Sequence, residues 1–173
     1  MIPLLDREIY ERFTESHLVR AQRYLWIATA NIKATGVRYH NRFISFPDLM
    51  ATLVNKGVAI RIIHAELPSR PFRELYDKID SKGRLSAGVE FLHCIRMHAK
   101  IIIVDGTVGL VGSANLTGAG VGAKSGKKRN FEAAFLLEGE EELAPFLDYF
   151  DNVWMGAHCS DCGQRDICPA PAA

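Results

Sequence analysis

The chain has 173 residues, of which 48% are hydrophobic and 24% are charged, and its formal net charge at pH 7 is +1. This balance is typical of one globular domain with a sizeable buried core, and it excludes an intrinsically disordered chain. A net charge so close to zero neither favours nor excludes nucleic acid as a partner, so any electrostatic binding surface has to be local.

Targeting and membrane signals are the next feature to consider. Met1–Leu5 show no basic leader followed by an apolar stretch, which is the pattern of a secretory signal. The chain contains no run of 18 apolar residues, and Ile101–Val104 is flanked by the charged Lys100 and Asp105. We therefore expect a cytoplasmic protein with no membrane partner.

The first half of the chain alternates between helical and extended patterns. Apolar positions at helical spacing predict a helix over 6–21, and a following apolar run predicts a strand over 24–30. Phe46-Pro47-Asp48 opens a second helix, which Gly57 ends after residue 56. Next in order come a β-branched strand, a helix and another strand, over 58–64, 71–80 and 89–95.

The second half begins with a predicted hairpin. Two apolar strands, 98–105 and 107–114, are joined by the Asp105-Gly106 turn, and a further strand covers 131–137. Apolar residues at helical intervals then predict an amphipathic helix over 140–154. This alternation predicts an α/β fold, a mixed β-sheet flanked by helices. We expect one catalytic domain over 1–155 and a cysteine-containing tail, 156–173, packed on it.

Polar side chains cluster at the predicted hairpin. In the predicted strand, His98 and Lys100 are two residues apart, so their side chains project to one face. Ser113 and Asn115 repeat this spacing on the neighbouring strand. A nucleophile, a cation and two neutral hydrogen-bonding groups are what a tetrahedral phosphate anion requires. The pattern therefore indicates phosphoryl transfer without a catalytic metal.

The spacing of these residues resembles the phospholipase D superfamily, whose motif reads H-x-K-x4-D-x6-G-S-x-N. All six specified positions are present at the spacing of the motif: His98, Lys100, Asp105, Gly112, Ser113 and Asn115. Downstream, Asn130-Phe131-Glu132 matches an Asn-x-Glu found in many members, and the order of elements from about Tyr24 to Trp154 suits the family fold. The resemblance implies a phospholipase D-like fold and a phosphodiesterase activity.

The resemblance also implies a role for each matching residue. His98 is expected to attack phosphorus and form a phosphohistidine intermediate. Lys100 and Asn115 are expected to hold the non-bridging phosphate oxygens, with Ser113 assisting. Glu132 is expected to accept a hydrogen bond from the far nitrogen of an active-site histidine. Asp105 belongs to the same catalytic motif, where we expect it to act as a local structural anchor.

The motif occurs once, which has a mechanical consequence. In-line displacement needs a nucleophile on one side of phosphorus and a proton donor on the other, and one His-x-Lys supplies only one of them. The small bacterial nucleases of the family solve this by two-fold pairing. By this resemblance we expect a homodimer with one composite site on its axis, in which His98 of the second subunit protonates the leaving oxygen.

The substrate is suggested by a glycine-rich basic segment that follows the second strand of the hairpin. This segment, 118–129, is expected to be flexible and to clamp a nucleic-acid backbone, and its cations are Lys124, Lys127, Lys128 and Arg129. Arg70, Arg73 and Arg84 are expected to widen the positive rim. An ordinary solvated loop remains open as an alternative. So do a phospholipid-hydrolysing enzyme and a module that binds nucleic acid without cutting it.

Three of the four cysteines lie close to the C-terminus. Cys159, Cys162 and Cys168 have the spacing C-x2-C-x5-C, and Cys94 lies far upstream. The spacing resembles the iron–sulfur staple of RecB-family nucleases, which implies a structural 4Fe–4S cluster held by all four cysteines. A closed structural zinc site, made by the four thiolates or by three thiolates with His93 or His158, remains open. Free thiols are the third alternative.

Overall fold

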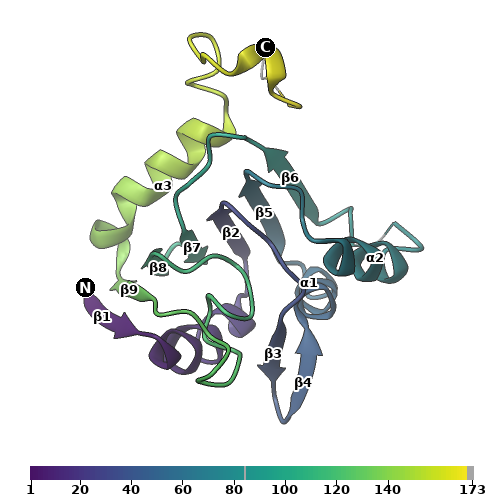
Figure 1. Cartoon of the computed structure of the whole chain (residues 1–173), viewed down its shortest axis with the longest axis vertical. Helices are drawn as coiled ribbons and strands as arrows, with labels where there is room; N and C mark the ends of the chain where they lie inside the picture. The colour runs from purple at the N-terminus through teal and green to yellow at the C-terminus, as the bar shows by residue number, and fades with distance from the viewer. Residues whose placement is uncertain (84, 171–173) are drawn as a thin grey trace.

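The computed structural model of the chain describes residues 1–83 and 85–170. Its centre is a seven-stranded mixed sheet with the strand order β1-β9-β8-β7-β2-β5-β6. The strands are β1 (Ile2–Leu5), β2 (Tyr24–Thr29), β5 (Ala59–His64), β6 (Val89–His93), β7 (Ile101–Val104), β8 (Val108–Gly112) and β9 (Ala133–Glu138). The α/β fold with a mixed sheet, predicted from the alternation of patterns, is confirmed (Figure 1).

The pairing of neighbouring strands changes from parallel to antiparallel at the centre of the sheet. β2, β5 and β6 run parallel, whereas β7 pairs antiparallel with β2 on one side and with β8 on the other. The four residues of β7, Ile-Ile-Ile-Val, are all buried. Ile102 and Val104 join one hydrophobic cluster, and Ile101 and Ile103 join the other. Such a strand is buried on both faces, which is why its sequence shows no polar alternation.

Helices cover both faces of the sheet. α1 (Phe46–Val54) and α2 (Arg70–Ile79) contribute Phe46, Leu49 and Phe72 to the larger cluster. On the other face, α3 (Glu140–Trp154) contributes Leu143 and Phe150 to the second cluster (Figure 1). The result is a three-layered α/β/α arrangement in which α3 alone among these helices faces the site described below.

Local signals explain the helix bounds. Ser45 caps α1, since its hydroxyl accepts from the backbone N–H of Asp48 while the Asp48 carboxylate accepts from Ser45, and Pro47 lies in the first turn. Gly57, with φ of +87°, follows the helix end as predicted. The amphipathic helix predicted over 140–154 is confirmed residue for residue as α3.

The helix predicted over 6–21 is wrong in extent and type. The chain forms a short π-helix, η1 (Ile9–Thr14), and then a 3-10 turn, η2 (Leu18–Arg20). Ile9, Tyr10 and Phe13 are fully buried against the larger cluster. The apolar spacing therefore marked the residues that pack on the core, but tertiary packing set a wider local turn than the α-helix.

Three strands were not predicted. β1 is an edge strand that pairs antiparallel with β9, and β3 (Gly36–Tyr39) and β4 (Arg42–Ser45) form a separate hairpin. These strands have four residues each and are largely exposed. Such short segments carry too little apolar alternation to be recognised, and the partner of β1 lies about 130 residues away in the chain.

Beyond α3 the chain forms turns and one 3-10 helix, η3 (Arg165–Ile167). In Figure 1 this tail lies beyond the end of α3, on the side of the molecule where β6 ends. Residues 171–173 of the predicted tail lie outside the described residues. Within the described part of the chain, no helix combines the length and the apolar character needed to cross a membrane.

Candidate active site

The motif residues lie at one end of the β7–β8 hairpin. The predicted strand over 98–105 is wrong at its start, because β7 begins at Ile101 and His98 and Lys100 occupy the segment that precedes it. One further hydrogen bond, from the N–H of Gly112, the last residue of β8, to the carbonyl of Lys100 at 3.2 Å, continues the pairing beyond the start of β7. This bond brings the segment before β7 beside the segment after β8.

A pocket of about 690 Å³ contains four of the predicted catalytic side chains: His98, Lys100, Ser113 and Asn115. Its apolar part comes from the hairpin and from one side of α3, through Ile101, Val111, Pro145, Phe146 and Tyr149. His98 and Ser113 are exposed, whereas Lys100 and Asn115 are half-buried. The structure therefore brings the nucleophile, the cation and the amide predicted for phosphate into one open pocket.

Lys100 is held beside His98 by the backbone. Its ammonium Nζ donates to the carbonyl oxygen of His98 at 2.6 Å. A lysine side chain has many rotamers in water, and a charge-assisted hydrogen bond to a fixed carbonyl restricts them. The ammonium group is thereby fixed at the backbone of His98, in the same pocket as the imidazole.

The orientation of the Asn115 amide is determined by its neighbours at the end of β2 and just beyond it. Asn115 Oδ1 accepts from the hydroxyl of Thr29 at 3.1 Å and from the backbone N–H groups of Ala30 and Asn31 at 3.2 and 3.3 Å. Backbone N–H groups only donate, so the atom that faces them has to be the oxygen. The Nδ2 group, with its two hydrogens, is consequently turned away from β2 and is available to a ligand.

Ser113 and Glu132 form a pair at the edge of the pocket. The Ser113 hydroxyl donates to Glu132 Oε2 and accepts from the N–H of Ala133 at 3.1 Å. Asn130 Nδ2 donates to Glu132 Oε1 at 3.0 Å, and the Glu132 N–H donates to Asp6 at 2.9 Å. Within one chain the recorded donors to the Glu132 carboxylate are thus Ser113 and Asn130, whereas sequence reasoning expected a histidine there.

Gly112 allows the close approach on which this pair depends. A Cβ at Gly112 would lie 2.4 Å from the carbonyl oxygen of Ala133 and 2.5 Å from the Cα of Ala134. Both atoms belong to the backbone of β9, which has no flexible end to move aside. The glycine of the motif is therefore needed for the pairing of β8 with β9, which places Ser113 next to Glu132.

Asp105 lies at the opposite end of β7 from His98. Its carboxylate accepts from the backbone N–H groups of Gln22, Arg23 and Tyr24, with the shortest distances at 2.9, 2.7 and 3.0 Å. Its φ of +56° and that of +72° at Gly106 form the tight turn predicted for this hairpin. Asp105 thus ties the hairpin turn to the start of β2, and it does not line the pocket.

The glycine-rich segment after β8 is folded back on itself. Its backbone is linked by hydrogen bonds such as Lys124 N to Gly118 O at 3.0 Å and Asn130 N to Ala119 O at 3.2 Å. Lys124, Lys127 and Lys128 are exposed and Arg129 is half-exposed. The four cations therefore face solvent on an ordered loop, beside the pocket in sequence but outside its lining.

The other predicted cations are dispersed. Arg70 and Arg73 belong to α2, which covers the opposite face of the sheet from α3 (Figure 1). Arg84 lies outside the described residues. The positive rim expected from these arginines is therefore not assembled at the pocket by the part of the chain that the structure describes.

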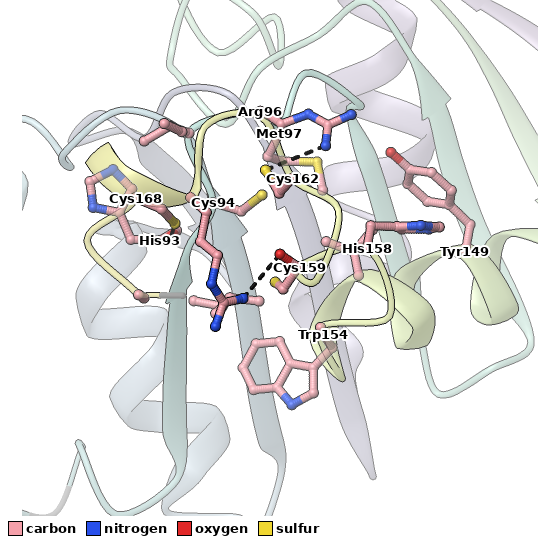
Figure 2. Close-up of a pocket in the computed structure, with 16 residues that line it drawn as sticks. His93, Cys94, Arg96, Met97, Tyr149, Trp154, His158, Cys159, Cys162 and Cys168 are labelled. Carbon is pink, nitrogen blue, oxygen red and sulfur yellow. Dashed lines mark hydrogen bonds between the residues drawn. The ribbon is translucent and has the colours of Figure 1, made fainter. Parts of the chain in front are cut away.

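The four cysteines line a second cavity of about 300 Å³ (Figure 2), which shares the lining residue Tyr149 with the first. Cys94 follows β6, and Cys159, Cys162 and Cys168 come from the tail. All four are half-buried free thiols. No three His, Cys, Asp or Glu side chains within residues 1–83 and 85–170 converge as a single ion requires. Arg96 donates to Cys162 Sγ at 3.5 Å, and this guanidinium lowers the pKa of the Cys162 thiol.

Some residues that shape the site were not found from sequence. Thr29, the last residue of β2, and Asn31, two residues further on, orient Asn115, and Tyr149 lines both the catalytic pocket and the cysteine cavity. Tyr149 interrupts the apolar stripe of α3 with an exposed aromatic ring, which was a usable signal. The roles of Thr29 and Asn31 arise from strand neighbours that sequence spacing does not reveal.

Comparisons with known proteins identify a family and similar folds. A family model described as "Cardiolipin synthase, PLD-like domain" matches residues 15–154. In fold, the chain is similar to Nuc, a phospholipase D family member from Salmonella typhimurium, with a TM-score of 0.58 and 20% identity over 88% of this chain and 94% of that one. NucT from Helicobacter pylori gives a TM-score of 0.56 and 13% identity over 88% and 94%.

A third similar structure is TrmBL2, an archaeal chromatin protein described as having a novel mode of DNA binding. Its TM-score is 0.55 at 16% identity, and the match covers 89% of this chain and 52% of that one. No curated protein gives a significant match to the chain. At these identities the three structures establish a common fold.

Proposed function

Because the chain belongs to the phospholipase D-like domain family, we propose that it is a metal-independent phosphodiesterase that hydrolyses DNA or RNA. The observation that carries the proposal is the pocket in which His98, Lys100, Ser113 and Asn115 meet. An imidazole for attack, an ammonium held 2.6 Å from the His98 carbonyl and an oriented amide match the needs of a phosphoryl group.

The first chemical step uses the exposed imidazole of His98. A neutral ring nitrogen attacks phosphorus in line with the leaving oxygen, so that a nitrogen–phosphorus bond forms as the phosphorus–oxygen bond breaks. Lys100 offsets the charge on the non-bridging oxygens, and Asn115 donates to them through the Nδ2 group that its contacts with β2 leave free. Ser113, whose hydrogen is directed to Glu132, contributes mainly by positioning.

The leaving oxygen needs a proton, and the motif supplies one histidine per chain. In the proposed dimer, His98 of the partner subunit donates this proton from the opposite side of phosphorus. The partner imidazole, now neutral, then takes a proton from water as the oxygen of that water attacks phosphorus. The nitrogen–phosphorus bond breaks, and both histidines return to their starting states.

A surface suitable for this pairing adjoins the pocket. Ile101 pairs with Val111, Val111 with Phe135, and Phe135 with Pro3, so these residues form one row across four strands. Ile101 and Val111 line the pocket, whereas Phe135 next to them is 49% exposed. A second copy of the chain that covers this row places two pockets face to face, because a two-fold interface uses the same patch twice.

Glu132 retains room for its predicted partner. An ionised carboxylate has about four acceptor positions, and Ser113 and Asn130 use two of them. Acceptance of an imidazole N–H by Glu132, either within the chain or across the dimer, therefore remains part of the proposal. Such a bond would fix the tautomer in which the opposite nitrogen is free to attack.

Nucleic acid is favoured as the substrate by the exposed cations of the ordered loop. The loop follows the site residues in sequence and carries Lys124, Lys127 and Lys128. A nucleic-acid backbone is a long polyanion, so it can contact this loop while one of its phosphates lies in the pocket. A phospholipid substrate and a non-cleaving DNA- or RNA-binding role are the alternatives. A phospholipid-hydrolysing enzyme would release lipid products and a non-cleaving protein would release none, so one assay of reaction products distinguishes both from a nuclease.

The decisive experiment profiles substrates with matched variants. Wild type is incubated with labelled single- and double-stranded DNA, RNA and phosphatidylcholine vesicles, with and without a brief EDTA treatment. His98→Asn is expected to abolish cleavage, and His40→Asn, an exposed histidine in the β3–β4 turn, is expected to retain it. Cleavage of vesicles alone, or binding of nucleic acid without cleavage, contradicts the proposed function.

A mixing experiment tests the composite site. Wild-type and His98→Asn chains are co-refolded or co-expressed at varied ratios, and the rate is plotted against the wild-type fraction. If both subunits supply a histidine to one site, the rate follows the square of that fraction. A linear dependence shows independent sites and refutes the shared mechanism. Phe135→Glu is expected to shift sedimentation toward the monomer and to lower the rate in parallel.

A further inference from the structure

The cavity between the tail and the end of β6 is unused by the proposed chemistry. It brings together one cysteine from the body, Cys94, and three from a tail more than 60 residues later in the chain. Figure 2 shows the four cysteines around this cavity, with His158, Arg96 and Trp154 at its margin. Convergence of all the cysteines of a chain on one cavity calls for a common partner.

The packing of the tail shows what the cysteines face. Cys159, Cys162 and Cys168 are half-buried, whereas most of the residues between them are exposed. Ile167, the large aliphatic residue of this stretch, is 71% exposed. The tail therefore turns its thiols toward the body and its aliphatic side chain toward solvent. Apolar burial this small does not offset the entropy of ordering some fifteen residues at roughly 1–2 kcal/mol each.

We propose that Cys94, Cys159, Cys162 and Cys168 together bind a four-iron iron–sulfur cluster that fastens the tail to the body. Thiolate–metal bonds supply the free energy that the tail lacks, since ligand binding at a structural metal site is folding free energy. Four cysteines are the usual ligand set of such clusters.

The size and lining of the cavity favour a cluster over a single zinc ion. Zinc–sulfur bonds of about 2.3 Å place four tetrahedral sulfurs about 3.8 Å apart, around a point. Here the thiols stand on the walls of a space of about 300 Å³ with apolar sides that include Leu92, Val153 and Trp154. A polynuclear core, whose ligands stand further apart, fits such a space.

Charge compensation is also present. Four thiolates around one centre accumulate negative charge in a partly apolar cavity, where an uncompensated charge is costly. Arg96 donates to Cys162 Sγ at 3.5 Å, and Arg165, also in the lining, donates to the carbonyl of Cys159 at 3.0 Å. One guanidinium group from the body and one from the tail thus lie next to the proposed cysteine ligands.

The nearby histidines are less suited as ligands. His93 bonds the carbonyl of Ala65 through Nε2 at 2.8 Å and stacks on His64 with ring centroids 4.8 Å apart. Its ring is thereby committed to the end of β5. His158 lines the cavity but is exposed, which makes it a suitable control rather than a ligand.

The proposed cluster also has a mechanical link to the catalytic pocket. Cys94 is held by a bond from its N–H to the carbonyl of His64 at 2.9 Å, and a turn closed by the Met97 N–H on the Cys94 carbonyl leads directly to His98. Tyr149 lines both cavities. A cluster bound at Cys94 therefore positions the segment 94–100 that carries His98 and Lys100.

The test begins with wild-type protein purified without oxygen. Iron, acid-labile sulfide and zinc are measured per chain, together with visible absorption. The proposal expects about four iron and about four sulfide per chain with a brown colour. A colourless protein with one zinc, or one whose cysteines prove to be disulfide-bonded by mass spectrometry, overturns it. This measurement needs no variant and no substrate, so its failure leaves the proposed nuclease activity untouched.

Matched variants then identify the ligands. Cys94→Ser and Cys162→Ser are expected to lose most of the iron, and His158→Ala is expected to keep it. Hydrogen exchange is expected to rise in the tail and in the segment 94–100 of the cysteine variants, and to stay unchanged in the strands of the sheet. Full iron retention in either cysteine variant, or loss in His158→Ala, refutes the four-cysteine assignment.

Discussion

Asp105 belongs to the catalytic motif, but its contacts predict that its substitution lowers stability and leaves activity largely intact. Replacement by alanine removes the acceptors of three backbone N–H groups at the start of β2. These donors are partly exposed and water replaces some of the lost bonding, so about 1 kcal/mol for each is appropriate. Alanine at a φ of +56° adds about 1 kcal/mol of backbone strain. The expected loss of unfolding free energy is about 4 kcal/mol.

The measurement is urea denaturation followed by the fluorescence of Trp26, which lies on β2 and stacks on Phe150 with ring centroids 4.9 Å apart. For a chain of this length, a loss of 4 kcal/mol corresponds to a fall in Tm of about 10 °C. Asp105→Asn is the matched control. It tolerates the positive φ and keeps one oxygen, so its loss is expected to be about 1–2 kcal/mol.

Activity measured well below the transition completes the test. A chromogenic phosphodiester reports the chemical step without any requirement for nucleic-acid binding. Asp105→Ala is expected to keep a rate within several-fold of wild type, because its carboxylate does not line the pocket. A loss of activity as deep as that of His98→Asn, with little change in stability, would show that Asp105 takes part in the chemistry and that this reasoning is wrong.

Three further predictions follow from other contacts. Gly112→Ala places a Cβ 2.4 Å from the carbonyl oxygen of Ala133, so it is expected to cost about 1–3 kcal/mol or more in urea unfolding, and an unchanged midpoint contradicts the close approach. Burial lowers the pKa of His64, so below about pH 6.5 the unfolded chain binds more protons than the folded chain, and the free energy of unfolding should fall as the pH drops through that value. Thermal melts at pH 7.5 and 5.5 should show this fall in wild type and a smaller one in His64→Leu. Lys127→Ala with Lys128→Ala is expected to reduce the salt dependence of nucleic-acid binding, by up to about two units of slope; an equal slope places the loop outside the complex.

Several local features of this protein were readable from its sequence. The Asp105-Gly106 turn, the residues that α3 buries and the motif spacing all depend on chemistry within a few residues, and the structure confirms the hairpin and the helix. Because strands β7 and β8 are joined by a tight turn, their register follows from the turn, and the register brings Lys100 opposite Gly112. The grouping of the motif residues was therefore a short-range inference.

Only the tertiary structure determined the contacts between segments that are distant in the chain. Thr29 turns the amide of Asn115, β1 extends the sheet beside β9, and the tail returns to Cys94. The start of β7 and the π-helical turn of η1 were mispredicted because packing against neighbours overrode the local pattern. Sequence periodicity records which residues are apolar or polar. Which partner each of them meets is a property of the folded chain, since that choice minimises the free energy of the whole core and of every buried polar group at once.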